Sequence, residues 1–233
     1  MNIILVGAKG KIGKVFAENL PEKNKIIEFV DKDNSVDFFA KFKKVADVLV
    51  DFSHHSLTPV ILEYGIKTLT PVVMGTTGHT DKENRLIEKA SKVIPIFKSG
   101  NMSTSIARLI RSAIDIIKRE KNAEVDIIEE HHDKKADAPS GTALMIAEKI
   151  KAVKGGKIVY GNFEGARNPE DIVLHSLRKG SCVGKHRIII TTANEIIELE
   201  HQALSRNIFA DGAITASEFL TKQKPGLYDI CSL

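Results

Sequence analysis

A short apolar segment followed by evenly spaced glycines opens the chain and constrains its fold more than any other feature. Residues 3–6 are all apolar, and Gly7, Gly10 and Gly13 follow at intervals of three residues. Such a run is typical of a buried parallel strand, and the glycine-containing turn leads into a helix. Glycines let a pyrophosphate approach the backbone there, and the N–H groups at the helix start bind anions. The spacing therefore predicts the first strand, turn and helix of a dinucleotide-binding domain.

The alternation of apolar runs and amphipathic segments continues to about residue 100 and predicts a Rossmann-type, doubly wound parallel sheet with right-handed crossovers. Gly65 is expected to end the helix before it. The expected strands are 26–30, 46–52, 71–74 and 94–97, and the expected helices are 13–20, 59–64 and 81–92.

The pattern then changes to one typical of an α+β domain with an open mixed sheet. Ser140 is expected to cap a helix that follows a polar loop at 131–139, and Ala193-Asn194 is expected to turn a hairpin. The expected helices are 103–120 and 140–153, and the expected strands are 125–129, 172–177, 187–192 and 196–202. A final helix at 209–222 should pack on the first domain. We thus expect a dinucleotide-binding domain at 1–102, completed by 207–233, and a substrate-binding and oligomerisation domain at 103–206.

Composition excludes several classes of protein. The 233 residues are 42% hydrophobic and 27% charged, which is too apolar for a disordered chain. The net charge of +4 comes from basic residues scattered among acidic ones, without Trp, so no nucleic-acid partner is expected. No apolar run reaches the roughly 18 residues that span a membrane. Cys182 and Cys231 are too few for a disulfide framework, so we expect a cytoplasmic protein.

The glycine-rich turn should bind a nicotinamide dinucleotide through residues Gly7, Ala8, Lys9, Gly10, Lys11 and Ile12. Asp31 ends the second expected strand, 18 residues after Gly13, where an acid can bind the ribose diol of NAD. Lys32 beside it could pair with the 2′-phosphate of NADP. The two residues leave NADH and NADPH both open.

Further strand ends should meet this edge, because ligands bind at the carboxyl ends of parallel strands. Glycine, threonine and asparagine at these positions offer close backbone approach and hydrogen bonds to ribose or carboxamide. The adjacent pair His54-His55 does not predict a metal site, because neighbouring residues rarely face one ion and no third ligand is near. The expected cofactor contacts are Gly75, Thr76, Thr77, Ser99, Gly100, Asn101 and Met102.

The most informative stretch for chemistry is the polar loop and the helix start that follows it. His131 and His132 stand four and three residues before Lys135, and Ser140-Gly141-Thr142 opens the next helix. A glycine-containing helix N-terminus binds carboxylates. Imidazole and ammonium groups beside it would bind an anionic substrate and supply a proton.

The motif E-x-H-H-x-x-K-x-D-A-P-S-G-T-A, residues 129–143, resembles the signature of the 4-hydroxy-tetrahydrodipicolinate reductase (formerly dihydrodipicolinate reductase) family of lysine biosynthesis. The resemblance covers nearly the whole chain. It continues through Gly75-Thr76-Thr77-Gly78, His175-Ser176-Leu177-Arg178 and Val183-Gly184-Lys185-His186.

The resemblance implies NAD(P)H-dependent reduction of a small cyclic dicarboxylate in the diaminopimelate pathway. It implies that His131 donates and accepts a proton and that Lys135 donates one. His132, Ser140, Gly141 and Thr142 would hold the substrate. It also implies a homotetramer built through the sheet of the second domain.

Three features depart from the family pattern. The connection between Lys32 and Val45 is shorter than in many members, which would trim the adenosine pocket. His54 replaces an arginine that helps hold a phosphate in some members, and Lys185 replaces a usual glutamate. Two alternatives stay open beside the reductase: a non-enzymatic dinucleotide sensor, and a related two-domain reductase of another imino acid.

Overall fold

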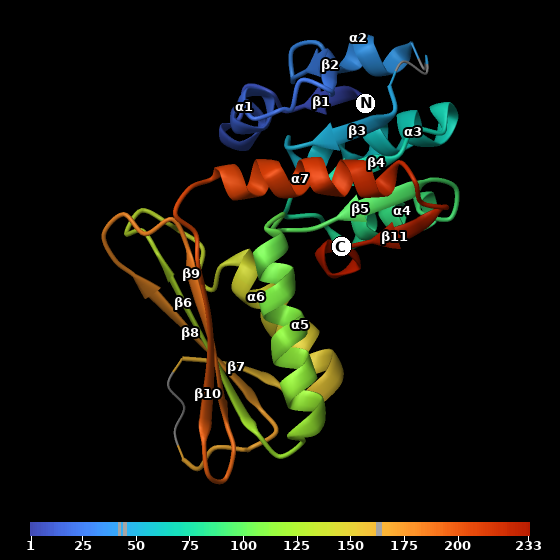
Figure 1. Ribbon diagram of the computed structural model, residues 1–233. Coiled ribbons are helices and arrows are strands. Elements are labelled where there is room, and N and C mark those ends of the chain that lie inside the picture. The colour runs from blue at the N-terminus through green and yellow to red at the C-terminus, as the bar shows by residue number, and fades with distance from the viewer. Residues whose placement is uncertain (42, 44–45, 162–164) are drawn as a thin grey trace. The chain divides into compact units, whose positions relative to one another are not determined.

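The computed structural model describes all residues except 42, 44–45 and 162–164, and it divides into two compact units (Figure 1). The first unit contains Met1–Thr104 and Arg206–Leu233, and the second contains Ser105–Ser205. Residues 42, 44 and 45 of the short connection 32–45 thus lie outside the described residues. Within the part of the chain that is described, no helix is both long and apolar enough to cross a membrane.

The first unit is built on a six-stranded sheet in which every pair of neighbouring strands is parallel. The strand order is β11-β5-β4-β3-β1-β2, which is the doubly wound arrangement that the sequence predicts. Its strands are β1 (Asn2–Val6), β2 (Lys25–Val30), β3 (Val48–Asp51), β4 (Val72–Met74), β5 (Pro95–Lys98) and β11 (Gly226–Tyr228). The central strands β1, β3 and β4 are fully buried apart from Asn2, as expected for strands covered on both faces.

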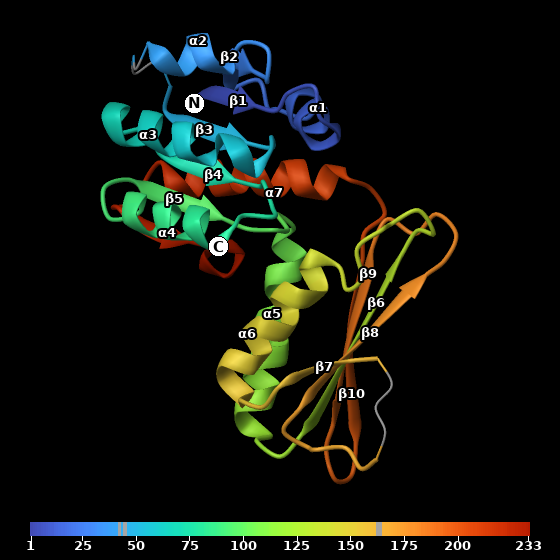
Figure 2. The same cartoon turned by 180° about the vertical axis from the view of Figure 1, so that it is seen from behind.

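Helices cover both faces of this sheet (Figures 1 and 2). The helices α1 (Lys11–Glu18) and α7 (Asn207–Leu220) contact each other, and α7 also contacts β3, β4 and β5, which confirms that the C-terminal helix returns to this unit. On the other face, α3 (Thr58–Thr68) contacts α2 (Ser35–Ala40) and α4 (Asp81–Ala90), and the three close one apolar core with the sheet. Two short 3₁₀ turns complete the unit, η1 (His55–Leu57) and η2 (Ile230–Ser232).

The second unit packs two helices on one face of a five-stranded mixed sheet (Figures 1 and 2). The strand order is β10-β9-β6-β8-β7. The pairs β10–β9 and β9–β6 are antiparallel, and the pairs β6–β8 and β8–β7 are parallel. The bounds are α5 (Thr104–Arg119), β6 (Glu124–His131), α6 (Gly141–Lys154), β7 (Ile158–Tyr160), β8 (Ile172–Arg178), β9 (Lys185–Thr191) and β10 (Ile196–Gln202). The hairpin between β9 and β10 confirms the predicted turn, which Thr192 closes by donating its N–H to Glu195 O at 2.9 Å.

Two details differ from the sequence prediction. Gly65 does not end α3, which continues to Thr68 and stops where Leu69 takes a left-handed conformation with φ 53°. A Cβ at Gly65 would lie 2.7 Å from the Ile94 side chain, so this glycine lets the helix approach the sheet closely. The short elements α2, β7 and β11 were not predicted, because three to six residues carry too little periodicity.

His131 also differs from its expected place in a polar loop. It is the last residue of β6, paired with Arg178 of β8, and it is buried. The side chains of Glu129 and His131 therefore point to the same face of the strand, because residues two apart in a strand share a face.

Candidate active site

The glycine-rich turn of the first unit is shaped by two close backbone approaches. Gly7 has a φ of 85°, and a Cβ there would collide with the carbonyl group of Phe52 after β3. A Cβ at Gly13 would collide with the carbonyl oxygen of Gly7, so only glycine lets α1 start this close to the turn. Gly10 occupies the N-cap position, and the first turn of α1 carries no acidic residue. The N–H groups of that turn can therefore receive an anion.

The acid at the end of β2 contacts this turn, as the sequence predicts. Asp31 Oδ1 accepts a hydrogen bond from the backbone N–H of Lys9 at 3.2 Å, and the Lys9 ammonium lies 2.7 Å from Asp33. Lys32 is exposed beside them. One acid and one lysine thus stand at the position that binds an adenosine ribose in dinucleotide-binding folds, which leaves both NADH and NADPH compatible with the local structure.

Two other predicted loops follow neighbouring strands at the same sheet edge. Gly75 follows β4, and a Cβ there would collide with the Phe52 ring, so glycine is required for this loop to pass. Ser99 and Asn101 follow β5 and are buried, and their side chains hydrogen-bond within the loop, Ser99 Oγ to Asn101 O and Asn101 Oδ1 to the N–H of Ser103. These two side chains therefore shape the loop. The predicted cofactor residues that share this edge are Gly7–Ile12, Asp31, Lys32, Gly75–Thr77 and Ser99–Met102.

A buried carboxyl group, Asp51, lies at the end of β3 in the middle of this edge. It accepts hydrogen bonds from the N–H and hydroxyl of Ser53 at 2.9 and 2.5 Å. Burial raises the pKa of Asp51, and the hydrogen bonds from Ser53 offset only part of this. Asp51 was not among the predicted site residues, and its contacts give it a role in holding the turn after β3.

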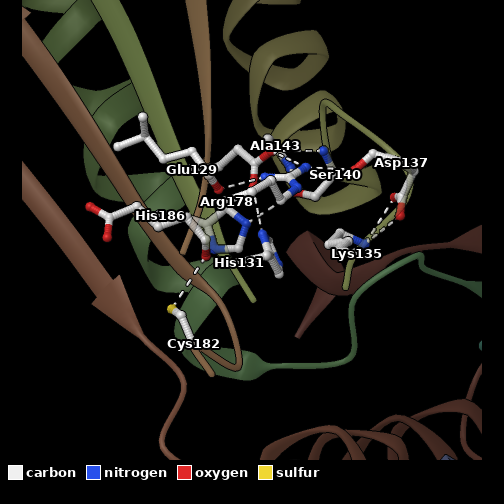
Figure 3. Close-up of polar contacts among 11 residues, drawn as sticks. Glu129, His131, Lys135, Asp137, Ser140, Ala143, Arg178, Cys182 and His186 are labelled. Carbon is white, nitrogen blue, oxygen red and sulfur yellow. Dashed lines mark hydrogen bonds and ion pairs between the residues drawn. The ribbon is translucent and has the colours of Figure 1, made fainter. Parts of the chain in front are cut away.

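In the second unit, His131 projects from the end of β6 against Glu129 (Figure 3). Its Nδ1 lies 2.5 Å from Glu129 Oε2, and its ring meets the ring of His186 edge to face, with centroids 5.4 Å apart. A Cβ at Gly184 would lie 3.0 Å from His131 Nε2. The imidazole is thus fixed at one nitrogen by a carboxylate, and a residue without a side chain packs beside the other.

Glu129 is the centre of the polar contacts in Figure 3. Its second oxygen, Oε1, lies 2.9 Å from Arg178 Nη2 and accepts the backbone N–H of Ser140 at 3.2 Å. Burial opposes ionisation of Glu129, but hydrogen bonds from His131, Arg178 and Ser176 outweigh it and hold its pKa at about 2. The carboxylate is therefore charged at neutral pH although its side chain has no exposed surface.

Lys135 lies apart from this cluster and points to Asp137 (Figure 3). Its ammonium group contacts both carboxylate oxygens of Asp137 at 2.8 and 2.9 Å. The guanidinium of Arg178 also donates to the carbonyl oxygen of Asp137 at 2.5 Å, which ties this part of the loop to β8. His132, by contrast, is held through its backbone, whose N–H donates to Cys182 O at 2.9 Å.

The start of α6 confirms the predicted cap. Ser140 Oγ accepts the N–H of Ala143 at 3.2 Å, and Ser140 itself is buried. Gly141 is exposed, and a Cβ there would have no neighbour within 4 Å, so no protein atom requires glycine at this position. Thr142 follows and is half-buried. The helix N-terminus thus presents an open surface beside a polar loop, as a site for a carboxylate requires.

His186 is a neutral imidazole behind this helix cap. Its Nε2 lies 3.4 Å from Ser140 Oγ, and only 3% of the residue is exposed. Burial, reinforced by the neighbouring His131, lowers the pKa of His186 to about 3. It therefore supports the cap and the His131 ring without carrying charge at neutral pH.

The structure thus brings His131 and Ser140 together through Glu129 and places Lys135 in the same loop, with a different partner. Sequence reasoning did not single out Glu129, Arg178, Gly184 and His186 as site residues. The i, i+2 spacing of Glu129 and His131 could have identified the first, had the strand been extended to residue 131. The others come from β8, β9 and the segment between them; they lie in two motifs of the family resemblance, 175–178 and 183–186, which do not by themselves give these residues a role.

Comparison with known proteins accounts for both units. The family described as "Dihydrodipicolinate reductase, N-terminus" matches residues 1–102, and "Dihydrodipicolinate reductase, C-terminus" matches residues 104–233. The chain belongs to the dihydrodipicolinate reductase family.

Individual members of this family are similar over almost their whole length. A 4-hydroxy-tetrahydrodipicolinate reductase of Caldanaerobacter subterraneus subsp. tengcongensis is 41% identical, with 98% of this chain and 96% of that protein covered. The reductase of Clostridium tetani is 37% identical, with 99% and 95% covered. A dipicolinate-bound dihydrodipicolinate reductase from Paenisporosarcina sp. TG-14 has the same fold, with a TM-score of 0.78, 21% identity and 98% and 97% coverage.

Proposed function

We propose that this chain is a 4-hydroxy-tetrahydrodipicolinate reductase that uses NADH or NADPH in the diaminopimelate route to lysine. One observation carries this function beyond family membership: a charged, fully buried Glu129 connects His131, at the end of β6, with the open N-terminus of α6, and the loop between them contains Lys135. A proton-transferring group, a cation and a helix N-terminus are what reduction of an anionic imine-type ring requires.

The cofactor fits the first unit because the turn at Gly7, Gly10 and Gly13 tolerates no side chain at two of its glycines and starts an uncapped helix. Residues Gly7–Ile12 would hold the pyrophosphate, Asp31 with Lys32 the adenosine ribose, and Gly75–Thr77 with Ser99–Met102 the nicotinamide half. When bound, NADH or NADPH supplies the hydride. The unit 1–102 with 207–233 is accordingly the cofactor-binding domain.

The substrate is a small cyclic dicarboxylate, and the second unit offers matching groups. Gly141 and Thr142 would bind one carboxylate at the helix start, with Ser140 setting the geometry through its cap. His132 and Lys135 add cationic or hydrogen-bonding groups, and His131 exchanges the proton that completes the reduction. Dipicolinate bound to the Paenisporosarcina reductase is a ligand of this chemical class. Residues 103–206 are accordingly the substrate-binding domain.

We also propose that the second unit assembles a homotetramer through its sheet. The helices cover one face of this sheet, and strand alternation places Ile128, Leu177, Ile189 and Ile196 on the other. Leu177 is 45% and Ile196 63% exposed, so this face leaves apolar surface open. Sedimentation equilibrium at micromolar concentration tests the assembly, and a monomer would contradict it. Cys182 and Cys231 do not form a disulfide with each other, which fits a cytoplasmic enzyme.

A coupled assay tests the activity directly. The purified chain is mixed with dihydrodipicolinate synthase, its substrates and either NADH or NADPH, and cofactor oxidation is followed by absorbance. We expect oxidation that depends on the synthase, with the ratio between the two cofactors set by Asp31 and Lys32. Binding of cofactor without any turnover would favour a non-enzymatic sensor, and turnover only with other cyclic or open-chain imino acids would favour a related reductase.

A further inference from the structure

The contacts of Glu129 suggest more than a structural ion pair. Its side chain has no exposed surface, and its two oxygens contact different partners. Oε1 is held by Arg178 at 2.9 Å and by the N–H of Ser140 at 3.2 Å, while Oε2 faces His131 Nδ1 at 2.5 Å. The two contacts on Oε1 come from β8 and from the start of α6, so the carboxylate cannot turn without breaking one of them.

We propose that Glu129 is the positioning residue of His131: it keeps a proton on Nδ1 and makes Nε2 the nitrogen that exchanges a proton with the substrate. This inference depends on the proposed function only where it says that Nε2 exchanges a proton with the substrate. The arrangement of Glu129, Arg178 and Ser140 is a property of the second unit, whichever substrate it binds.

The argument for the proton on Nδ1 follows from the chemistry of the partners. An ionised carboxylate only accepts hydrogen bonds, so the His131 nitrogen that faces it must donate. In the neutral imidazole the other nitrogen, Nε2, then has a free lone pair, and in the imidazolium it carries the transferable proton. A carboxylate behind the ring also stabilises the imidazolium that forms when Nε2 takes a proton, as the buried aspartate of a serine protease does.

The surroundings of Nε2 agree with this assignment. A Cβ at residue 184 would lie 3.0 Å from Nε2, so the chain places its one side-chain-free residue type beside this nitrogen. His186 approaches the ring edge to face, with a centroid distance of 5.4 Å, and fixes its plane. One nitrogen is thus held by a carboxylate, the ring plane is set by a neighbour, and a residue without a side chain packs beside the other nitrogen.

Arg178 completes the arrangement by linking Glu129 to the loop that contains Lys135. Its guanidinium donates to Asp137 O at 2.5 Å and contacts Glu129 Oε1, and Asp137 in turn binds Lys135. Arg178 thus contacts Glu129, which precedes the loop, and Asp137, which lies in it. The loss of Glu129 should therefore change the position of His131 most and that of Lys135 less.

The test is the tautomer of His131 in the intact chain. With ¹⁵N-labelled histidine, two-bond nitrogen–proton correlation spectra at alkaline pH identify which ring nitrogen bears the proton, and a His131→Gln spectrum assigns the signal. We expect the Nδ1–H tautomer in the wild type. The Nε2–H tautomer would overturn the proposal without any reference to activity.

The variant Glu129→Gln tests the cause. Its amide oxygen must stay with the two donors, Arg178 and the N–H of Ser140, so its NH₂ group faces Nδ1. Nδ1 can then only accept, and the proton should move to Nε2. With substrate, kcat should fall by about 10- to 100-fold, as for other lost orienting partners, and KM should change little. An unchanged tautomer in Glu129→Gln would overturn the proposal. If Glu129→Gln does not fold, the wild-type tautomer still tests the proposal. Glu129→Asp, which keeps the charge, tests it as well and should show the Nδ1–H form.

Glu130→Gln is the matched control. Glu130 is the next residue of the same strand, is also buried, and points to the opposite face, where it binds Lys179 at 2.7 Å. It should keep the wild-type tautomer of His131. Failure of the proposed function would appear differently: the wild type would show the Nδ1–H tautomer and no turnover of 4-hydroxy-tetrahydrodipicolinate.

Discussion

The two candidate binding regions are built in different ways, and the difference explains how each can be perturbed. The turn at Gly7–Gly13 is made of backbone: its shape depends on residues that have no side chain and on a carbonyl of Phe52 nearby. The region around His131 is made of side chains, which reach it from β6, β8, β9 and the start of α6. Steric changes should therefore damage the first region, and changes of charge or hydrogen bonding should damage the second.

The largest loss of activity is expected for variants of the region around His131. His131→Ala and Lys135→Ala should each lower kcat/KM by at least about 100-fold, because a proton-transferring or charge-positioning group is lost. Lys134→Ala, a neighbouring exposed lysine of the same loop, is the matched control and should stay near wild type. The coupled assay measures all three, and wild-type rates in both test variants would remove these residues from the reaction.

In the first region, Gly7→Ala should act through sterics alone. Its φ of 85° is unfavourable for alanine, and the new Cβ would meet the Phe52 carbonyl. The free energy of unfolding should fall by about 1–3 kcal/mol, and affinity for NADH and NADPH should fall with it. Urea unfolding and fluorescence titration of the cofactor measure the two effects. Gly161→Ala is the control for positive φ without a close neighbour, and it should lose stability but keep cofactor affinity.

Gly141→Ala should separate ligand binding from folding in the second region. No protein atom lies within 4 Å of the new methyl group, so thermal stability should be kept or slightly raised, since alanine favours a helix. If a substrate carboxylate binds at the helix start, the methyl group should raise KM roughly tenfold, or about 1.4 kcal/mol. An unchanged KM would move the carboxylate site away from Gly141.

The smallest expected effect compares two imidazole–carboxylate pairs, His131–Glu129 and His55–Glu83. The pKa of each glutamate is lowered to about 2, in Glu129 against its burial and in Glu83 chiefly by the hydrogen bond from His55. A lowered carboxyl pKa contributes stability that is complete above pH 4.5 and is lost as the pH falls towards 2. His186, with its pKa near 3, already lowers stability as the pH drops below 6.5.

Acid titration of the free energy of unfolding measures this comparison. Glu129→Gln and Glu83→Gln should each flatten the loss below pH 4.5, and by similar amounts, because the pKa of both carboxyls is about 2. A much smaller flattening in Glu83→Gln would mean that solvent screens its pair, because the Glu83 side chain is 12% exposed and that of Glu129 is fully buried.

The same difference explains what could be predicted from the sequence. The cap at Ser140 depends on Ala143, three residues further on, so a local rule predicts it. The turn at Gly7–Gly13 and the acid at Asp31 have a recognisable spacing along the chain, although their contacts reach Phe52 and Lys9. The parallel sheet followed from the alternation of its strands and helices. The prediction that Gly65 ends its helix was wrong, because this glycine is needed for a tertiary contact: it faces Ile94 and Val72 where the helix packs on the sheet.

The partners of His131 could not be predicted in this way. Ser140 and His186, which meet behind the helix cap, are 46 residues apart in the chain. Arg178 reaches Glu129 only because β8 pairs in parallel with β6, in register from Val125 to His131. Strand register is set by the packing of the whole sheet, and the polar composition of residues 129–133 hides the last two residues of β6.

The return of Arg206–Leu233 to the first unit has a consequence for biosynthesis. The strand β11 forms the edge of the first sheet beside β5, and α7 covers part of one face, yet both are translated after the whole second unit. Until they leave the ribosome, β5 remains an open edge and apolar surface under α7 stays in water, which invites association between nascent chains. The first unit must therefore wait for segments that are translated after the second unit, whereas Ser105–Ser205 can complete its own sheet while synthesis continues.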